Sequence, residues 1–122
     1  MRFTHDTLAQ RVVLDTGRVT ERVLSEAEQL GMSRPMLIST DGTHEVAEAI
    51  AAVLPPAHHW RDAVQHVPRS VADAATAAAR QVEADGLISI GGGSATGLAK
   101  AIALATSLPI IAVPTTYAAS EA

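Results

Sequence analysis

The chain is 122 residues long, 48% of them hydrophobic, and it has a formal net charge of −4 and no cysteine. That length and apolar content allow one compact domain, which we place over residues 1–122, whereas the lack of cysteine excludes disulfides and thiolate metal ligands and is typical of the reducing cytoplasm. Basic residues are scattered and no stretch approaches the ~20 apolar residues of a membrane span, so we expect neither nucleic acid nor a membrane as partner.

In the first half of the chain, apolar runs alternate with segments of helical spacing. Arg11–Leu14 predicts a strand, and Val19–Leu30 predicts an amphipathic helix because its apolar residues recur every three or four positions. Gly31 follows at the position where a glycine commonly ends a helix. Met36–Ser39 is a second predicted strand, and residues 46–54 carry another helical stripe that ends before two prolines.

The second half continues the same alternation. Its strongest signal is the apolar run Ile110–Val113, which is typical of a strand buried on both faces. The other predicted elements are a weaker strand at 59–64, a helix at 71–82 behind the expected cap Ser70, a strand at 87–90 and a helix at 95–105. Alternation on this scale predicts an α/β fold, a Rossmann-like parallel sheet with helices on both faces and right-handed crossovers.

Several polar residues and glycines directly follow predicted strands. In a parallel sheet of this kind, ligands bind beyond the carboxyl ends of the strands. We therefore expect the residues after the second, fourth and fifth strands to gather at one edge of the sheet: Thr40 and Asp41, Gly91 to Ser94, and Thr115 to Tyr117.

Three consecutive glycines and a serine separate the fourth predicted strand from the helix after it: Gly91, Gly92, Gly93 and Ser94. Glycine lets the backbone approach a bound group, and the first N–H groups of a helix favour an anion. We expect Ser94 to be the N-cap of this helix and a donor to a phosphate oxygen. The alternative is a tight turn that binds nothing.

Spacing excludes two sharper glycine motifs. A P-loop needs lysine where Leu98 stands, and a nucleophile elbow needs glycine where Thr96 stands.

The common dinucleotide fingerprint differs too, since its acidic residue follows the glycines by about 20 positions, whereas Asp41 precedes them. An acidic residue there can accept hydrogen bonds from the adenosine ribose and repel a 2′-phosphate, which favours NAD over NADP, or it can be a turn residue or helix N-cap. The spacing alone predicts a nucleotide site without identifying the nucleotide.

Three histidines raise the question of a metal site. His58 and His59 are adjacent, so on a strand they point to opposite faces, and His66 lies at a strand-to-helix junction. We therefore expect no metal site. Trp60 is expected to pack at a sheet edge or subunit contact, and Lys100 either reaches a phosphate or lies on a solvated helix face.

Residues 91–103, GGGSATGLAKAIA, and residues 114–121, PTTYAASE, closely resemble maleylacetate reductases, a branch of the iron-containing alcohol dehydrogenase-like superfamily. Gly97 and Tyr117 point to this branch, since the wider alcohol dehydrogenase group has Asp where Gly97 stands. Ala119 departs from the glycine usual in the branch. The resemblance covers essentially the whole chain but only about the first third of a family member. It implies a dehydroquinate synthase-like N-terminal nucleotide-binding domain whose helical C-terminal domain is absent here.

The resemblance also implies roles for single residues. Gly91, Gly92, Gly93 and Ser94 would hold the cofactor diphosphate, Thr115 and Thr116 would lie along its adenine and ribose, Tyr117 belongs to the same cofactor-binding set, and Asp41 matches the ribose-contacting acid. No catalytic residue is assigned.

The activity implied by the resemblance is NAD(P)H-dependent reduction of the 2,3 double bond of maleylacetate to 3-oxoadipate, a step in bacterial breakdown of aromatic compounds. NADH is the favoured cofactor, the substrate is a small molecule, and no metal site is expected in this chain. The expected protein partner is a second copy that pairs along residues 3–14. The alternatives are a metal-dependent alcohol dehydrogenase relative and a non-catalytic nucleotide-binding fragment, and we expect the 122-residue chain alone to be inactive.

Overall fold

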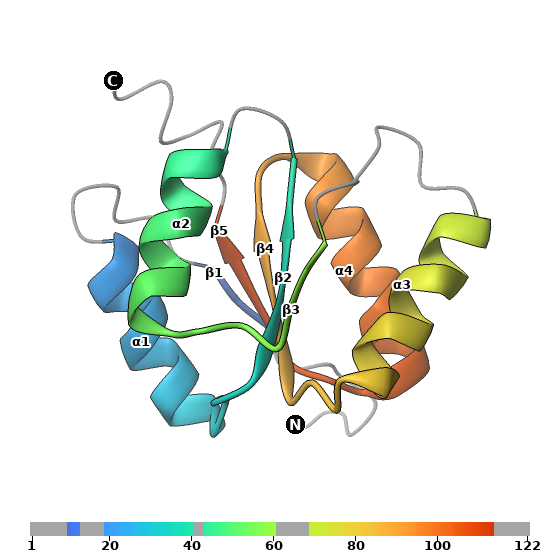
Figure 1. Ribbon diagram of the computed structural model, residues 1–122, viewed down its shortest axis with the longest axis horizontal. Coiled ribbons are helices and arrows are strands. Elements are labelled where there is room, and N and C mark those ends of the chain that lie inside the picture. The colour runs from blue at the N-terminus through green and yellow to red at the C-terminus, as the bar shows by residue number, and fades with distance from the viewer. Residues whose placement is uncertain (1–9, 13–18, 41–42, 61–68, 114–122) are drawn as a thin grey trace, which may run out of the picture.

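The computed structural model describes residues 10–12, 19–40, 43–60 and 69–113. Strands and helices alternate through these ranges (Figure 1): β1 Gln10–Val12, α1 Val19–Leu30, β2 Pro35–Ser39, α2 His44–Val53, β3 His58–Trp60, α3 Arg69–Gln81, β4 Gly86–Ile90, α4 Gly93–Thr106 and β5 Ile110–Val113. The strands form one sheet in the order β1-β5-β4-β2-β3, and all paired strands are parallel. None of the described helices combines the length and hydropathy that crossing a lipid bilayer requires.

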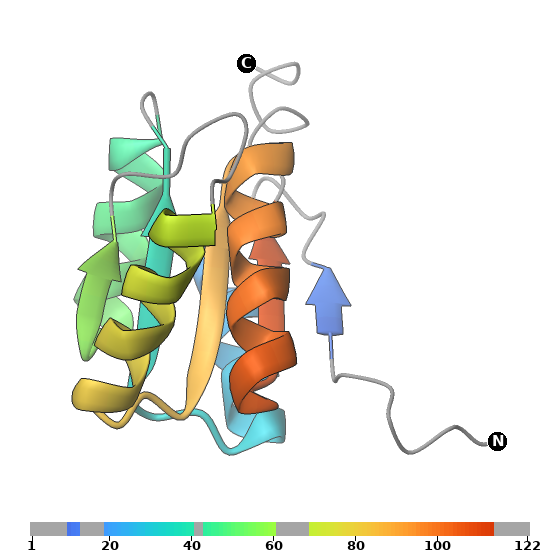
Figure 2. The ribbon, with the colours of Figure 1, turned by 90° about the vertical axis from the view of Figure 1, so that its right-hand side faces the viewer.

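Helices cover both faces of the sheet (Figures 1 and 2). α1 and α2 pack on one face, and α3 and α4 pack on the other. Parallel neighbours cannot be joined by a tight hairpin, so each connection crosses the sheet as a helix and covers part of a face. The predicted Rossmann-like architecture is confirmed.

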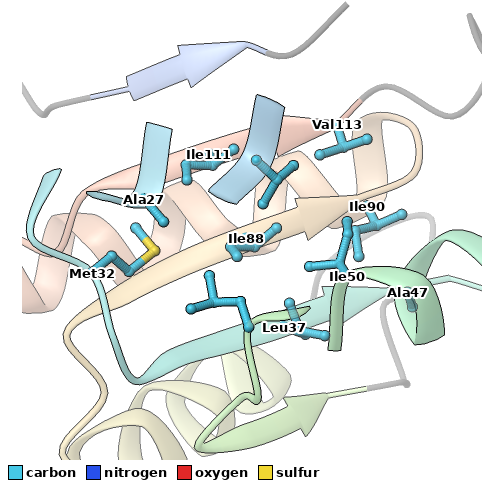
Figure 3. Close-up of a cluster of buried hydrophobic side chains, with 11 residues drawn as sticks. Ala27, Met32, Leu37, Ala47, Ile50, Ile88, Ile90, Ile111 and Val113 are labelled. Atoms are coloured by element: carbon cyan, nitrogen blue, oxygen red, sulfur yellow. The ribbon is translucent and has the colours of Figure 1, made fainter. Parts of the chain in front are cut away.

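The core on the α1 and α2 face is one cluster of aliphatic side chains (Figure 3). Every second strand residue points into it, as the two-residue period of a strand requires. Truncating a buried isoleucine of this kind to alanine costs about 2–5 kcal/mol of stability. The main contributors are Leu37, Ile88, Ile90, Ile111 and Val113 from the strands, with Val23, Ala27, Ala47 and Ile50 from the helices.

The three inner strands differ from the outer strand β3. Every residue of β2, β4 and β5 is buried, whereas β3 is only partly buried throughout. Full burial is typical of parallel strands covered on both faces. Trp60 packs from β3 against the α3 and α4 cluster, so the expected place at a sheet edge is confirmed.

The helix ends agree with the sequence in one case and correct it in two. α1 spans 19–30 as predicted, and Gly31 follows with a φ of +72°. The prediction that Ser94 caps α4 is wrong, because Gly93 is already helical and Gly92 is the N-cap. Ser70 is likewise inside α3, which begins at Arg69.

At the amino edge of the sheet, Asp85 fastens the loop between α1 and β2. Its carboxylate accepts hydrogen bonds from the backbone N–H of Ser33 at 2.7 Å and of Arg34 at 2.8 Å, and from the Ser33 hydroxyl at 3.1 Å. The Arg34 guanidinium donates to the carbonyl of Val82 at 2.7 Å. These four residues, the Asp85 clasp, join the end of the loop that leads into β2 to the residues just before β4.

Candidate functional site

The direction in which the chain moves through the sheet reverses between β2 and β4. β2 leads through α2 to β3, whereas β4 leads through α4 to β5 on the other side, and α2 and α4 cover opposite faces. The carboxyl edge of the sheet at such a reversal, here called the gap, is where ligands bind in open parallel sheets. At this edge, Ser39 is aligned with Ile90, and Ile90 with Val113.

Thr40 and Gly91, which follow β2 and β4, lie side by side at this gap. Gly91 donates its N–H to the carbonyl of Val113 at 3.0 Å and has a φ of +137°, where side chains are rarely tolerated. A Cβ added at Gly91 would lie 2.7 Å from the Thr40 hydroxyl oxygen and 3.6 Å from the Cβ of Ala95. Both the backbone angle and the neighbouring threonine therefore require glycine at this position.

The glycine turn leads directly into the N-terminus of α4. Gly92 is the N-cap, and it has no side chain with which to cap the helix end. The carbonyl of Gly92 accepts the N–H of Thr96 at 3.2 Å, but the N–H groups before it have no partner within a helix. The dipole of a helix of 14 residues adds positive potential at this end. The turn thus offers backbone donors and favourable potential to an anionic group such as a diphosphate.

Two hydrogen bonds join the residues on either side of Asp41 and Gly42. The carbonyl of Thr40 accepts the backbone N–H of Thr43 at 3.2 Å and its hydroxyl at 2.7 Å. Thr43 is buried and is the N-cap residue of α2. Thr40 and Thr43 are therefore held together at the carboxyl edge, next to the glycine turn. Asp41 itself lies outside the described residues.

The structure brings part of the predicted site together. Gly91 and Gly92 form the turn at the gap, and Gly93 and Ser94 are the first residues of α4. Thr40 lies against Gly91, as the gathering of strand ends predicted. Four predicted cofactor-binding residues lie outside the described residues, so their roles stay predictions: Asp41, Thr115, Thr116 and Tyr117.

One polar contact below this edge was missed by sequence analysis. The Ser39 hydroxyl, which is 1% exposed, lies 2.7 Å from Nε2 of His59. Leu37 is the register partner of His59, so the contact runs diagonally from β3 to the carboxyl end of β2. The only sign of this contact in the sequence is a serine at the end of an apolar run. That pattern does not indicate which residue the serine hydroxyl contacts.

Metal ligands do not gather in the part of the chain that the structure describes. No three His, Asp or Glu side chains there are placed to hold a metal ion. For the residues outside those ranges, the expectation of no metal site stays a prediction. Two hollows lined by described residues, of about 280 and 520 Å³, lie between α3 and α4 and are separate from the glycine turn.

Comparisons with known proteins give a family and several relatives. Residues 9–122 match the family described as iron-containing alcohol dehydrogenase. Maleylacetate reductases from Rhizobium sp. strain MTP-10005 and Pseudomonas sp. strain P51 are 46% and 43% identical over 98% and 99% of this chain. The chain spans about a third of their length, 34% and 35%. The crystal structure of an iron-containing alcohol dehydrogenase from Corynebacterium glutamicum matches 100% of this chain and 34% of its own, with a TM-score of 0.80 and 43% identity.

Proposed function

The chain belongs to the iron-containing alcohol dehydrogenase family, and on this premise we propose that it is the cofactor-binding part of an NAD(P)H-dependent maleylacetate reductase. The observation that carries the proposal is the identity of 43–46% with two maleylacetate reductases along nearly the whole chain. Gly97 and Tyr117, the residues that point to this branch, support the same substrate.

The gap beside Gly91 is the proposed place of the cofactor diphosphate. Three features of the described residues support this: the positive φ of Gly91, the absence of room for a Cβ next to Thr40, and the start of α4 without a side-chain cap. Backbone N–H groups at a helix start bind phosphate oxygens without needing a positively charged side chain.

The bound reduced nicotinamide supplies the hydride that converts maleylacetate to 3-oxoadipate. The task of this chain is to hold the other half of the cofactor in place. In the proposal, Gly92, Gly93 and Ser94 present donors to the diphosphate, and the bonded pair Thr40 and Thr43 holds the neighbouring segment against the gap.

Asp41 is the proposed basis for a preference for NADH. A carboxylate at the end of β2 can accept hydrogen bonds from the ribose hydroxyls, and it repels the 2′-phosphate of NADPH. Thr115, Thr116 and Tyr117, which follow β5, are proposed to line the adenine and ribose side. β5 is adjacent to β4, which supports a place for them at the same edge.

A second candidate function is a metal-dependent alcohol dehydrogenase. The similarity to the Corynebacterium glutamicum protein, named an iron-containing alcohol dehydrogenase, favours it. The two candidates share the cofactor gap and differ in the substrate.

We further propose a homodimer that pairs along residues 3–14 and a cytoplasmic location, where reduced nicotinamide cofactors are regenerated.

The cofactor part of the proposal is tested by fluorescence titration of the chain with NADH and, separately, NADPH. We expect saturable binding of NADH, loss of it in Gly93→Asp, and tighter binding of NADH than of NADPH. Asp41→Asn should reduce that preference while it leaves NADH binding measurable. Equal binding of NADH by the native chain and Gly93→Asp, with unchanged circular dichroism, would contradict a diphosphate site at this turn.

The substrate is tested with the product of the complete gene. We expect NADH consumption that depends on maleylacetate and yields 3-oxoadipate. Oxidation of small alcohols that requires added divalent metal, without turnover of maleylacetate, would replace the first candidate by the second.

A further inference from the structure

Five residues form a single stripe along the exposed side of α3 and the residues just after it. Within α3, the spacing of four, three and four is that of a helix-pairing seam, which keeps one side of a helix facing a partner; Glu83 follows the helix end, with a φ of +56°. All are exposed except Thr76, which is partly buried. The stripe consists of Arg69, Asp73, Thr76, Arg80 and Glu83.

The charges of this stripe are self-complementary in one orientation only. When a second α3 lies antiparallel with Thr76 against Thr76, Asp73 faces Arg80, and Arg69 lies at the end of the partner helix that Glu83 follows, each once on either side of the axis. In a parallel alignment, each charged residue would instead face its own copy, so that like charges would repel. A two-fold axis produces the antiparallel arrangement from two identical chains.

We propose that this stripe is an interface at which α3 pairs with α3 of a second copy of the chain, about a two-fold axis beside Thr76. The interface goes beyond the proposed function and lies on a helix face, apart from the expected pairing along residues 3–14. A protein that uses both surfaces assembles beyond a dimer, because each two-fold interface joins a different pair of copies.

The charged groups of the stripe are available to a partner. Arg69, Asp73 and Glu83 form no ion pair with another described residue, and all three are exposed. Arg80 donates one guanidinium N–H to the carbonyl of Ala105 at 2.8 Å, which fixes the side chain over the hollow between α3 and α4. Its remaining N–H groups can reach a carboxylate, since a guanidinium has five.

An apolar contact accompanies the charges. Leu104 of α4 is 78% exposed, the largest exposure among the large hydrophobic residues described as exposed. It lines the hollow of about 520 Å³ together with Ala72, Ala101 and Ala105. Small side chains let two helices approach to about 8 Å between their axes, and a leucine from the partner fits against such a surface.

The absence of native cysteine permits a direct test by single-cysteine cross-linking. Thr76→Cys puts a thiol at the proposed axis, where it meets its own copy, and a disulfide forms only when the two Cα atoms come within about 7 Å. We expect Thr76→Cys to form covalent dimer roughly tenfold faster than Lys100→Cys, an exposed position of α4 outside the stripe, because pairing raises the local thiol concentration. Equal rates for the two variants would overturn the proposal.

Charge exchange gives a second, independent test. Asp73→Arg and Arg80→Asp each put like charges together in the two-fold pair, so each alone should weaken self-association about tenfold in sedimentation velocity. An equimolar mixture of the two variants restores both opposite-charge pairs and should recover the native association. Variants that fold normally but fail to recover on mixing would contradict the antiparallel pairing.

Discussion

Strand β4 has a glycine at its amino end and is followed by another at its carboxyl end, and the two have different surroundings. A Cβ at Gly86 would overlap Cε of Met32 and lie 2.7 Å from its Cγ and Sδ, all in a flexible side chain of the core. A Cβ at Gly91 would meet the hydroxyl of Thr40, and Gly91 also has a φ of +137°. Gly86 leaves space for the packed side chain of Met32. Gly91 instead leaves the backbone accessible beside the Thr40 hydroxyl at the carboxyl edge.

The hydrogen bonds at the two edges of the sheet differ in the same way. At the amino edge, the Asp85 clasp binds backbone donors of the α1–β2 loop within the protein. At the carboxyl edge, the N-cap of α4 is Gly92, which has no side chain to satisfy the first N–H groups of the helix. Donors that are satisfied internally contribute to stability, and donors left open are available to a ligand. We therefore infer that the hydrogen bonds of the amino edge stabilise the fold and that the donors of the carboxyl edge bind a ligand.

The largest effect is expected from Gly91→Ala. Positive φ and the conflict with Thr40 together should lower the free energy of unfolding by roughly 2–4 kcal/mol and abolish NADH binding. Chemical denaturation and NADH titration measure the two effects. The double variant Gly91→Ala/Thr40→Ala should regain part of the stability, because it removes the conflict and leaves the strain in φ. Full recovery of stability would show that the backbone angle is unimportant.

Asp85→Ala removes the carboxylate that forms the Asp85 clasp at the amino edge. The loss of an acceptor for two backbone N–H groups should cost about 2 kcal/mol of stability and leave NADH affinity unchanged. Asp85→Asn, which keeps one acceptor oxygen, should cost less. A fall in NADH affinity of folded Asp85→Ala would contradict the separation of the two edges.

Gly86→Ala should have a smaller effect, about 1–2 kcal/mol, because the methionine it displaces is flexible. Thermal unfolding measures it, and Met32→Ala in the same chain should offset part of the loss by clearing the space. A loss as large as that of Gly91→Ala would remove the distinction between the two glycines.

Gly97→Ala should give the smallest change and one of opposite sign. Apart from its chain neighbours and the adjacent helix backbone, no atom of the described residues lies within 4 Å of the position of its Cβ, so alanine fits in α4 and should raise the free energy of unfolding by about 0.5–1 kcal/mol. Destabilisation on denaturant titration would show that the glycine is needed for packing.

The sequence predicts those parts of the fold that depend on local periodicity. The helix at 19–30 and the strand at 110–113 coincide with α1 and β5, because helical and strand spacing are visible in a single segment. The start of α4 was missed, because three successive glycines leave the first helical residue undetermined. The contact of Ser39 with His59 depends on β2 lying beside β3, an order that alternation alone does not fix. The sequence predicts that Thr40 and Gly91 share one edge of the sheet, but their direct approach depends on β2 lying beside β4.

The most direct test of a cofactor site at the carboxyl edge is NADH titration of Gly86→Ala and Gly91→Ala side by side, with circular dichroism to establish folding. The two substitutions add the same methyl group at opposite ends of β4. We expect Gly86→Ala to bind NADH as the native chain does and Gly91→Ala to lose binding. Native-like NADH binding by folded Gly91→Ala would contradict a dinucleotide site at this gap.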